Sequence, residues 1–284
     1  MKILPECYAC AMRQALSAAR LVTDDEDFHH RCLLETAGIL SRSRRDMTPP
    51  EVGEQFYRVV RELSGSADPF REQKRRQNDA VLSLLPWLRD TVARAEDPLL
   101  MAVRLAIAGN AVDPGAQESF DLETSVMEAV SGEAGLDAYP ALLEGLSRAR
   151  TVLLIADNCG EIVFDLVLVE TILASRNLEV VVAVRGGPII NDATELEARE
   201  VGMDRVATVI SSGMEMPGTV VTRSTGRFRE AFEAADIVIS KGQGNWETLD
   251  DSSREVFFLL QAKCRAVAAM NRCAEGQALL IRNR

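Results

Sequence analysis

Apolar residues recur at intervals of three and four positions along the first half of the chain. This spacing is typical of one face of an α-helix, and β-branched runs are scarce here. Helix starts are marked where Thr48 precedes Pro49 and Pro50, and where Asp97 precedes Pro98. The pattern predicts an all-helical domain or cap, with helices over residues 11–21, 30–41, 50–63, 71–85, 99–108 and 122–130.

From residue 150 onward, short and nearly continuous apolar runs alternate with amphipathic stretches. Such runs are typical of strands buried on both faces of a parallel sheet, joined by right-handed helical crossovers. The stretches at 162–173 and 194–201 would be two of those helices. Strands are expected at residues 151–156, 178–184, 205–211, 236–240, 265–270 and 278–281, and the domain boundary near residues 145–150.

Composition narrows the class of protein. The 284 residues carry a formal charge of −11, and 47% of them are hydrophobic. Disorder is excluded, and the acidic balance argues against nucleic acid or an anionic membrane as the main partner. With no apolar run of membrane-spanning length and no signal-peptide pattern at residues 1–20, a cytoplasmic protein is expected. Its six cysteines should then be reduced: Cys7, Cys10, Cys32, Cys159, Cys264 and Cys273.

Histidine is confined to the adjacent pair His29 and His30, inside an acidic helical stretch. A Ser-His-Asp triad, a Cys-His dyad or a histidine-rich metal centre would need one of these two residues. An exposed surface pair is the better interpretation. The chemistry is therefore expected to depend on carboxylates, amides, a lysine or a metal held by oxygen.

Polar side chains follow several of the predicted strands. Asp157 and Asn158 leave the first strand, and Asn191 and Asp192 follow the second after a Gly-Gly-Pro loop. A Ser-Ser-Gly turn ends the third, and Lys241 begins a glycine-rich turn after the fourth. Each feature alone fits a helix cap, a turn or a surface lysine. Together, at the carboxyl edge of one sheet, they indicate hard oxygen ligands for Mg²⁺ or Mn²⁺ and a cradle for an oxyanion.

Asn110 and Asp113 extend the candidate site from the first half of the chain. They form either a helix stop and a turn or a loop that covers the sheet edge. Standard phosphatase signatures are excluded, because Asp165 stands where a Cys-x5-Arg motif needs arginine and no phosphate-binding P-loop is present. The Cys7-x2-Cys10 pair is read first as buried thiols, second as part of a structural metal site, and third as a redox pair.

In combination, these motifs resemble the metal-dependent damage-control phosphatase family, formerly domain of unknown function eighty-nine and also called ARMT-like. The match resembles its prokaryotic Cys-x2-Cys branch and runs over nearly the whole chain. The residues that carry it are Pro5-Glu6-Cys7-x2-Cys10, Asp68-Pro69-Phe70, Gly109-Asn110-x2-Asp113, Asp157-Asn158-x-Gly160-Glu161-x2-Phe164-Asp165, Arg185-Gly186-Gly187-Pro188-x2-Asn191-Asp192-Ala193-Thr194 and Lys241-Gly242-Gln243-Gly244-Asn245-x-Glu247.

The resemblance implies an α + α/β protein. A helical domain at residues 1–147 would precede a three-layer α/β/α, Rossmann-like domain at 148–284 with a mainly parallel sheet. It implies a divalent metal, Mg²⁺, Mn²⁺, Co²⁺ or Ni²⁺, held by Asp157, Asn158 and Asp192. Hydrolysis of small phosphate esters is implied, with sugar phosphates or damaged phosphometabolites as the substrate class.

Candidate roles follow from charge. Lys241 and the loop amides would share the phosphoryl charge, while Glu161 or Asp113 would orient the attacking water. Asp157 is an alternative nucleophile, so direct and covalent routes both stay open. The residues expected to bind substrate are Asn110, Arg185, Gly242, Gly244 and Asn245.

Two other function classes stay open. One is a carboxyl methyltransferase that uses S-adenosylmethionine, which would leave the Asp-Asn-Asp set unexplained. The other is a non-catalytic protein that binds a metal or a nucleotide. The expected partner is a small phosphorylated metabolite, without nucleic acid or membrane, and a homo-oligomer is left open.

Overall fold

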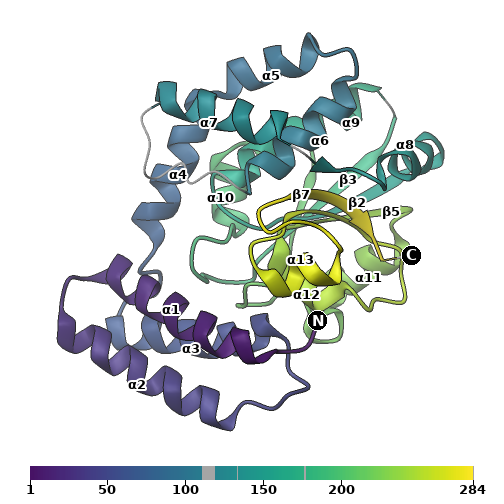
Figure 1. Cartoon of the computed structure of the whole chain (residues 1–284). Helices are drawn as coiled ribbons and strands as arrows, with labels where there is room; N and C mark the ends of the chain where they lie inside the picture. The colour runs from purple at the N-terminus through teal and green to yellow at the C-terminus, as the bar shows by residue number, and fades with distance from the viewer. Residues whose placement is uncertain (111–118, 133, 176, 284) are drawn as a thin grey trace.

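The computed structural model describes residues 1–110, 119–132, 134–175 and 177–283, and it shows helices arranged around one central sheet (Figure 1). The first three helices lie together at one end of the molecule: α1 (Pro5–Val22), α2 (Glu26–Arg42) and α3 (Pro49–Ser64). Thr48 caps α3 in a capping box with Glu51, as Pro49 and Pro50 predict, and Gly65 ends that helix in the left-handed region.

Within the described residues the strands form one seven-stranded sheet in the order β1-β7-β6-β5-β2-β3-β4. Their bounds are β1 (Ala134–Gly135), β2 (Thr151–Ile155), β3 (Glu179–Val184), β4 (Thr208–Ser211), β5 (Ile237–Lys241), β6 (Phe257–Gln261) and β7 (Ala278–Arg282). All neighbouring pairs are parallel except β6 and β7. The chain runs outward from β2 through β3 to β4 and then returns to place β5 on the other side of β2. The carboxyl ends of β2 and β5 therefore form a topological switch point, where α/β proteins bind ligands.

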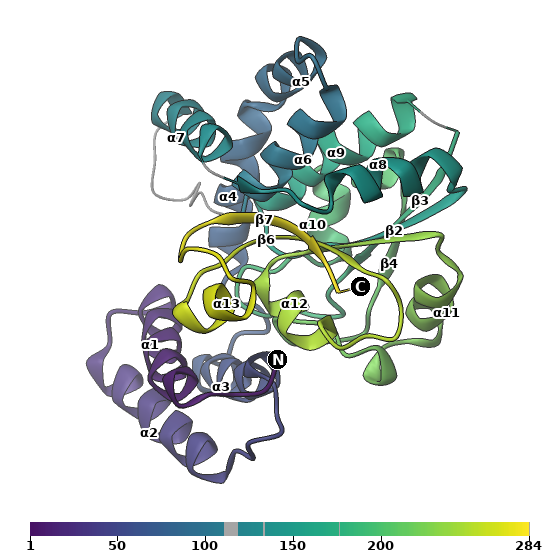
Figure 2. The same ribbon diagram turned by 45° about the vertical axis from the view of Figure 1, so that its right-hand side comes forward.

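Helices cover both faces of the sheet, which gives the α/β/α layers that the resemblance implies (Figure 2). One face packs against α4 (Arg71–Ser83), α5 (Leu85–Ala93), α6 (Pro98–Ala108), α7 (Ser119–Ser131), α8 (Tyr139–Arg148), α9 (Glu161–Ser175) and α10 (Glu195–Glu200). The other face packs against α11 (Gly226–Ala234), α12 (Gln243–Leu249) and α13 (Arg265–Met270).

Buried apolar side chains divide the molecule after α3. Helices α1–α3 enclose their own core, centred on Phe56 and Val60. Helices α4–α8, by contrast, share one core with the sheet, where Leu105 and Leu142 pack in the same cluster as Leu154. A division of the chain at residue 147 stays a prediction, while these cores separate α1–α3 from the rest.

In the last third of the chain one expectation was wrong and one strand was missed. Residues 265–270 form helix α13 rather than a strand, because Arg-Ala-Val-Ala-Ala-Met is rich in the best helix former and follows an extended cap at Cys264. The apolar run Phe257–Gln261, which was not named as a strand, forms β6. No helix in the described part of the chain is long and apolar enough to cross a membrane.

Candidate active site

The predicted polar residues meet at the carboxyl ends of three neighbouring strands. Asp157 and Asn158 follow β2, Asp192 lies on the loop after β3, and Lys241 is the last residue of β5. A short antiparallel bridge pairs Asn158 with Asp192, which brings the two loops into contact. Segments far apart in the sequence thus converge as their strand positions predict.

Asp157, Asn158 and Asp192 line a cavity of about 970 Å³ between this sheet edge and helices α1 and α3. Its walls combine apolar groups, such as Phe56, with charged ones, such as Lys263. We call the three polar residues the cavity triad. The triad is the part of the predicted site that a small molecule in this cavity would reach.

Lys241 lies behind the triad and is fully buried. Its Nζ donates to Glu161 Oε1 at 2.6 Å, Asp165 Oδ1 at 2.6 Å and the carbonyl of Ala106 at 2.8 Å. A lysine ammonium has three donors, and all three are used here. Lys241 is not among the residues that line the cavity, because its acceptors come from α6 and α9, which the strand pattern did not place beside it. Direct binding of a phosphoryl group by Lys241 stays a prediction.

Arg185 is also buried and holds two carboxylates of the site. Its Nε donates to Asp192 Oδ2 at 2.6 Å and its Nη2 to Asp157 Oδ1 at 3.0 Å. Its Nη1 donates to Asn245 Oδ1 at 2.9 Å, and the Asn245 amide in turn donates to the carbonyls of Ala156 and Lys241. Both residues were expected to bind substrate. In this structure their side chains contact Asp157, Asp192 and the strand ends, and substrate binding by them stays a prediction.

Two glycines of the turn after β5 allow close approach. Gly242 has φ +79°, and a Cβ there would lie 1.9 Å from Asp157 Oδ2. Gly244 lines the cavity, and a Cβ there would lie 1.9 Å from the carbonyl oxygen of Pro217. A side chain at either position would displace its neighbour. Binding of substrate by their amides stays a prediction.

Asn110, just beyond the end of α6, reaches the site from the helical half as expected. Its Nδ2 donates to Glu161 Oε2 at 2.7 Å and to Asp157 Oδ2 at 3.3 Å. Asn158 Nδ2 donates to the same two oxygens, at 3.2 Å and 3.0 Å. Two amides therefore join the triad to Glu161. Asp113, the other candidate from this segment, lies outside the described residues.

Buried charges in the site do not balance. Among the described residues, four carboxylates face two cations, namely Asp157, Glu161, Asp165 and Asp192 against Arg185 and Lys241. Burial raises the pKa of Asp157 to about 8, with Asp192 and Glu161 adding to the rise. Burial likewise raises the pKa of Asp192, although Arg185 opposes it. Of the four, only Glu161 departs from this trend: burial would raise its pKa, but Lys241, with smaller effects of Asn110 and Lys263, lowers it.

Comparison with known proteins gives the site a context. A model of the damage-control phosphatase ARMT1-like domain matches residues 3–279. The chain belongs to the damage-control phosphatase family. A damage-control phosphatase of Pyrococcus horikoshii is 33% identical over 100% of this chain and 99% of its own length. One of Archaeoglobus fulgidus is 35% identical over 94% of each chain.

The fold agrees with this membership. The crystal structure of a DUF89 family protein from Pyrococcus horikoshii superposes with a TM-score of 0.93, at 33% identity and over the whole of both chains. An uncharacterized protein of Methanocaldococcus jannaschii is 33% identical over 94% of this chain. The α + α/β fold is thereby confirmed, and membership in this family supports phosphatase as the class of enzyme.

A divalent cation, which the family suggests, fits the charge of the site. The excess of buried carboxylates and the raised pKa of Asp157 both favour the binding of a cation beside these residues. Asn110 Oδ1 is buried without a hydrogen-bond partner in the described structure. Across the same residues, no three His, Cys, Asp or Glu side chains form a metal-binding group by themselves. A metal site would therefore combine two carboxylates with an amide oxygen, a hard donor set.

Sequence reasoning missed the roles of two residues of this candidate site. Lys263 lines the cavity, and its charge opposes the rise in the pKa of Asp157 and adds to the lowering of the pKa of Glu161. It lies two residues after the end of β6, so recognising residues 257–261 as a strand would have placed it at the same sheet edge. Asp165 was part of the quoted motif but received no role, because its partnership with Lys241 appears only in the folded chain.

Proposed function

We propose that the protein is a divalent-metal-dependent phosphatase that hydrolyses small phosphate monoesters, with sugar phosphates or damaged phosphometabolites as the substrate class. The observation that carries the proposal is the cavity triad, which lies on the wall of the 970 Å³ cavity with Lys263 also lining it. A cavity of this size is at the upper end of the range for small-molecule sites. Membership in the phosphatase family supports the same reaction class.

Asp157, Asn158 and Asp192 would hold Mg²⁺, Mn²⁺, Co²⁺ or Ni²⁺. When bound, such an ion supplies Lewis-acid polarisation of a phosphoryl oxygen and neutralises negative charge. Lys263 lines the same cavity, and its charge opposes the rise in the pKa of Asp157, so it would stabilise the phosphoryl charge that develops on the substrate. The Gly244 backbone lies on the same wall.

Glu161 acts from behind the triad. Its Oε1 accepts from Lys241 and its Oε2 accepts from both Asn110 and Asn158. In this arrangement it fixes the side-chain amide of Asn158, so that the oxygen of that amide turns away from Glu161. Glu161 is therefore a positioning residue in the proposal. The attacking group is either a water in the cavity or Asp157, the carboxylate of the triad that follows β2.

The direct test measures phosphate release from a panel of sugar phosphates and other small monoesters. The protein is first stripped with a chelator and then supplied with each of the four metals. Metal-restored phosphate release supports the proposal. Release that is unaffected by chelation removes the metal from it, and no release with any ester and metal contradicts phosphatase function.

The same preparation separates the alternatives. A methyltransferase would transfer a methyl group from S-adenosylmethionine and release no phosphate, whereas a binding protein would retain ligand without turnover. The relatives named damage-control phosphatase do not favour the methyltransferase. Cytoplasmic location and a homo-oligomer stay predictions.

A further inference from the structure

The loop that carries Asp192 is strained just before that residue. Ile190 has φ +41°, a left-handed backbone conformation in a β-branched residue. Such residues rarely adopt positive φ, because the branched side chain collides with the backbone, and the conformation persists only where the surroundings enforce it. The Asp192 amide donates to the carbonyl of Ile189 at 3.0 Å, so the strained turn sets the direction of Asp192.

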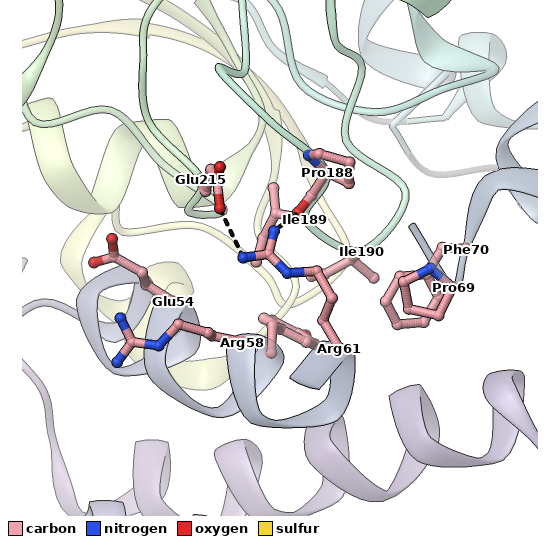
Figure 3. Close-up of a pocket in the computed structure, with 10 residues that line it drawn as sticks. Glu54, Arg58, Arg61, Pro69, Phe70, Pro188, Ile189, Ile190 and Glu215 are labelled. Carbon is pink, nitrogen blue, oxygen red and sulfur yellow. Dashed lines mark hydrogen bonds and ion pairs between the residues drawn. The ribbon is translucent and has the colours of Figure 1, made fainter. Parts of the chain in front are cut away.

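Arg61, which belongs to helix α3, contacts this loop (Figure 3). Its Nη1 donates to the carbonyl of Pro188 at 3.1 Å, and its Nη2 lies 2.8 Å from Glu215 Oε2. The planar guanidinium of Arg61 therefore joins the loop that carries Asp192 to the loop after β4. The close-up shows the guanidinium of Arg61 between Pro188 and Glu215, with Ile189 and Ile190 nearby.

Two further contacts tie the loop to the helices. The side chain of Ile189 is 4% exposed and packs in the core of α1–α3 rather than in the core of the sheet. Asn191 Nδ2 donates to Gln77 Oε1 of α4 at 3.1 Å. The position of Asp192 thus depends on how the α1–α3 group docks on the α/β layers.

We propose that Arg61 is a positioning residue for the metal site, which holds the strained loop so that Asp192 faces Asp157 and Asn158. This inference rests on the proposed role of the triad in metal binding. A partly exposed ion pair such as Arg61–Glu215 contributes little to stability on its own. Its contact with the carbonyl of Pro188, four residues before Asp192, affects the loop instead.

The test compares Arg61→Gln with Arg58→Gln, in metal-free protein titrated with Mn²⁺ by calorimetry. Arg58 lies about one turn earlier on α3 and, with Arg61, Pro188 and Glu215, lines the small pocket drawn in Figure 3; its Nε lies 3.8 Å from Glu62 Oε1. Without the contacts of Arg61, the loop would hold Asp192 in the metal-binding position for only part of the time. If that fraction is about a tenth, the Mn²⁺ affinity of Arg61→Gln falls about tenfold. Arg58→Gln keeps the wild-type affinity, and Arg61→Lys, which keeps the charge without the planar guanidinium, falls between the two.

A second readout needs no metal. The amide of Cys159 donates to the carbonyl of Asn191 at 2.7 Å, so its hydrogen exchange reports how firmly the loop is held. We expect exchange at Cys159 and Asp192 to be about tenfold faster in Arg61→Gln and unchanged in Arg58→Gln. Wild-type exchange in Arg61→Gln, or equal acceleration in Arg58→Gln, overturns the proposal. Absence of Mn²⁺ binding in the wild type contradicts the proposed function instead, and exchange still decides the role of Arg61.

Discussion

The cavity triad and the ion network behind it, in which Lys241 pairs with Glu161 and Asp165 of α9, both lie near the same edge of the sheet, yet they differ in what they can do. Asp157, Asn158 and Asp192 line the cavity. Lys241 has all three donors committed to protein acceptors, and it is fully buried. A polar residue at a strand end therefore either meets the ligand or holds the residues that do. Substitutions in the two groups should separate these roles, one by lost chemistry and the other by lost folding.

Asp192→Asn should have the largest effect on turnover. The asparagine can still accept from Arg185 Nε through its oxygen, so the fold should survive, but one negative charge facing the metal is lost. If that charge accounts for about 4 kcal/mol of transition-state stabilisation, kcat/KM falls about 10³-fold. Phosphate release at saturating metal measures this, with Asp204→Asn, an exposed carboxyl, as the control. Near-wild-type turnover at limiting metal would remove Asp192 from the ligand set.

Lys241→Met should have the largest effect on folding. It leaves Glu161 and Asp165 buried without their cation, and breaking a buried pair in this way costs about 3–5 kcal/mol. The midpoint of urea unfolding, or failure to fold at all, measures the loss. A loss below about 1 kcal/mol would contradict the buried ion pairs of Lys241 with Glu161 and Asp165, and it would favour direct contact between Lys241 and phosphate.

Lys263→Met, in contrast to Lys241→Met, should reduce activity and leave stability nearly unchanged. We expect kcat/KM to fall about 10²-fold, because one electrostatic donor to the phosphoryl group is lost. The free energy of unfolding should change by no more than about 0.5 kcal/mol, as for other surface positions. Arg265→Met is the matched control, since Arg265 lines the same cavity and its side chain is 96% exposed. If both variants lose the same activity, the effect of Lys263 is one of general charge.

These two groups also differ in how far the sequence could predict them. Apolar runs located β2, β3 and β5, and the strand-end rule then brought Asp157, Asn158 and Asp192 together correctly. The pattern could not show which way a strand-end side chain turns. The direction of the Lys241 side chain depends on its acceptors in Glu161, Asp165 and Ala106, which only tertiary packing places beside it.

Three other features could not be predicted from the sequence, each for a local reason. Lys263 was missed because the apolar run before it was not recognised as β6. Residues 265–270 were taken for a strand because a mostly apolar helix of six residues is too short to show a helical period. Arg61 could not be found at all, since its role depends on the positive φ of Ile190, which no sequence pattern indicates for an isoleucine.

The smallest expected effect is a change in the pH dependence of stability. Burial raises the pKa of Asp165 to about 7, with Lys241 opposing and Glu161 adding to the rise. Between about pH 4 and pH 7 the folded state therefore keeps a proton that the unfolded state has lost. The free energy of unfolding of metal-free protein should fall as pH rises through this window, because the folded state binds more protons.

Asp165→Asn removes this titration while the amide oxygen can still accept from Lys241. We expect the variant to lose stability less steeply than the wild type between pH 4 and pH 7, and to reach at least wild-type stability at pH 8, where the wild-type carboxyl must be charged. Urea midpoints at four or five pH values, all in chelator, measure both curves. The matched control is Asp79→Asn, an exposed carboxyl on α4 that pairs with Arg75, which should leave the slope unchanged. Parallel curves for Asp165→Asn and the wild type would mean that Asp165 is charged throughout, and that Lys241 compensates both of its carboxylates.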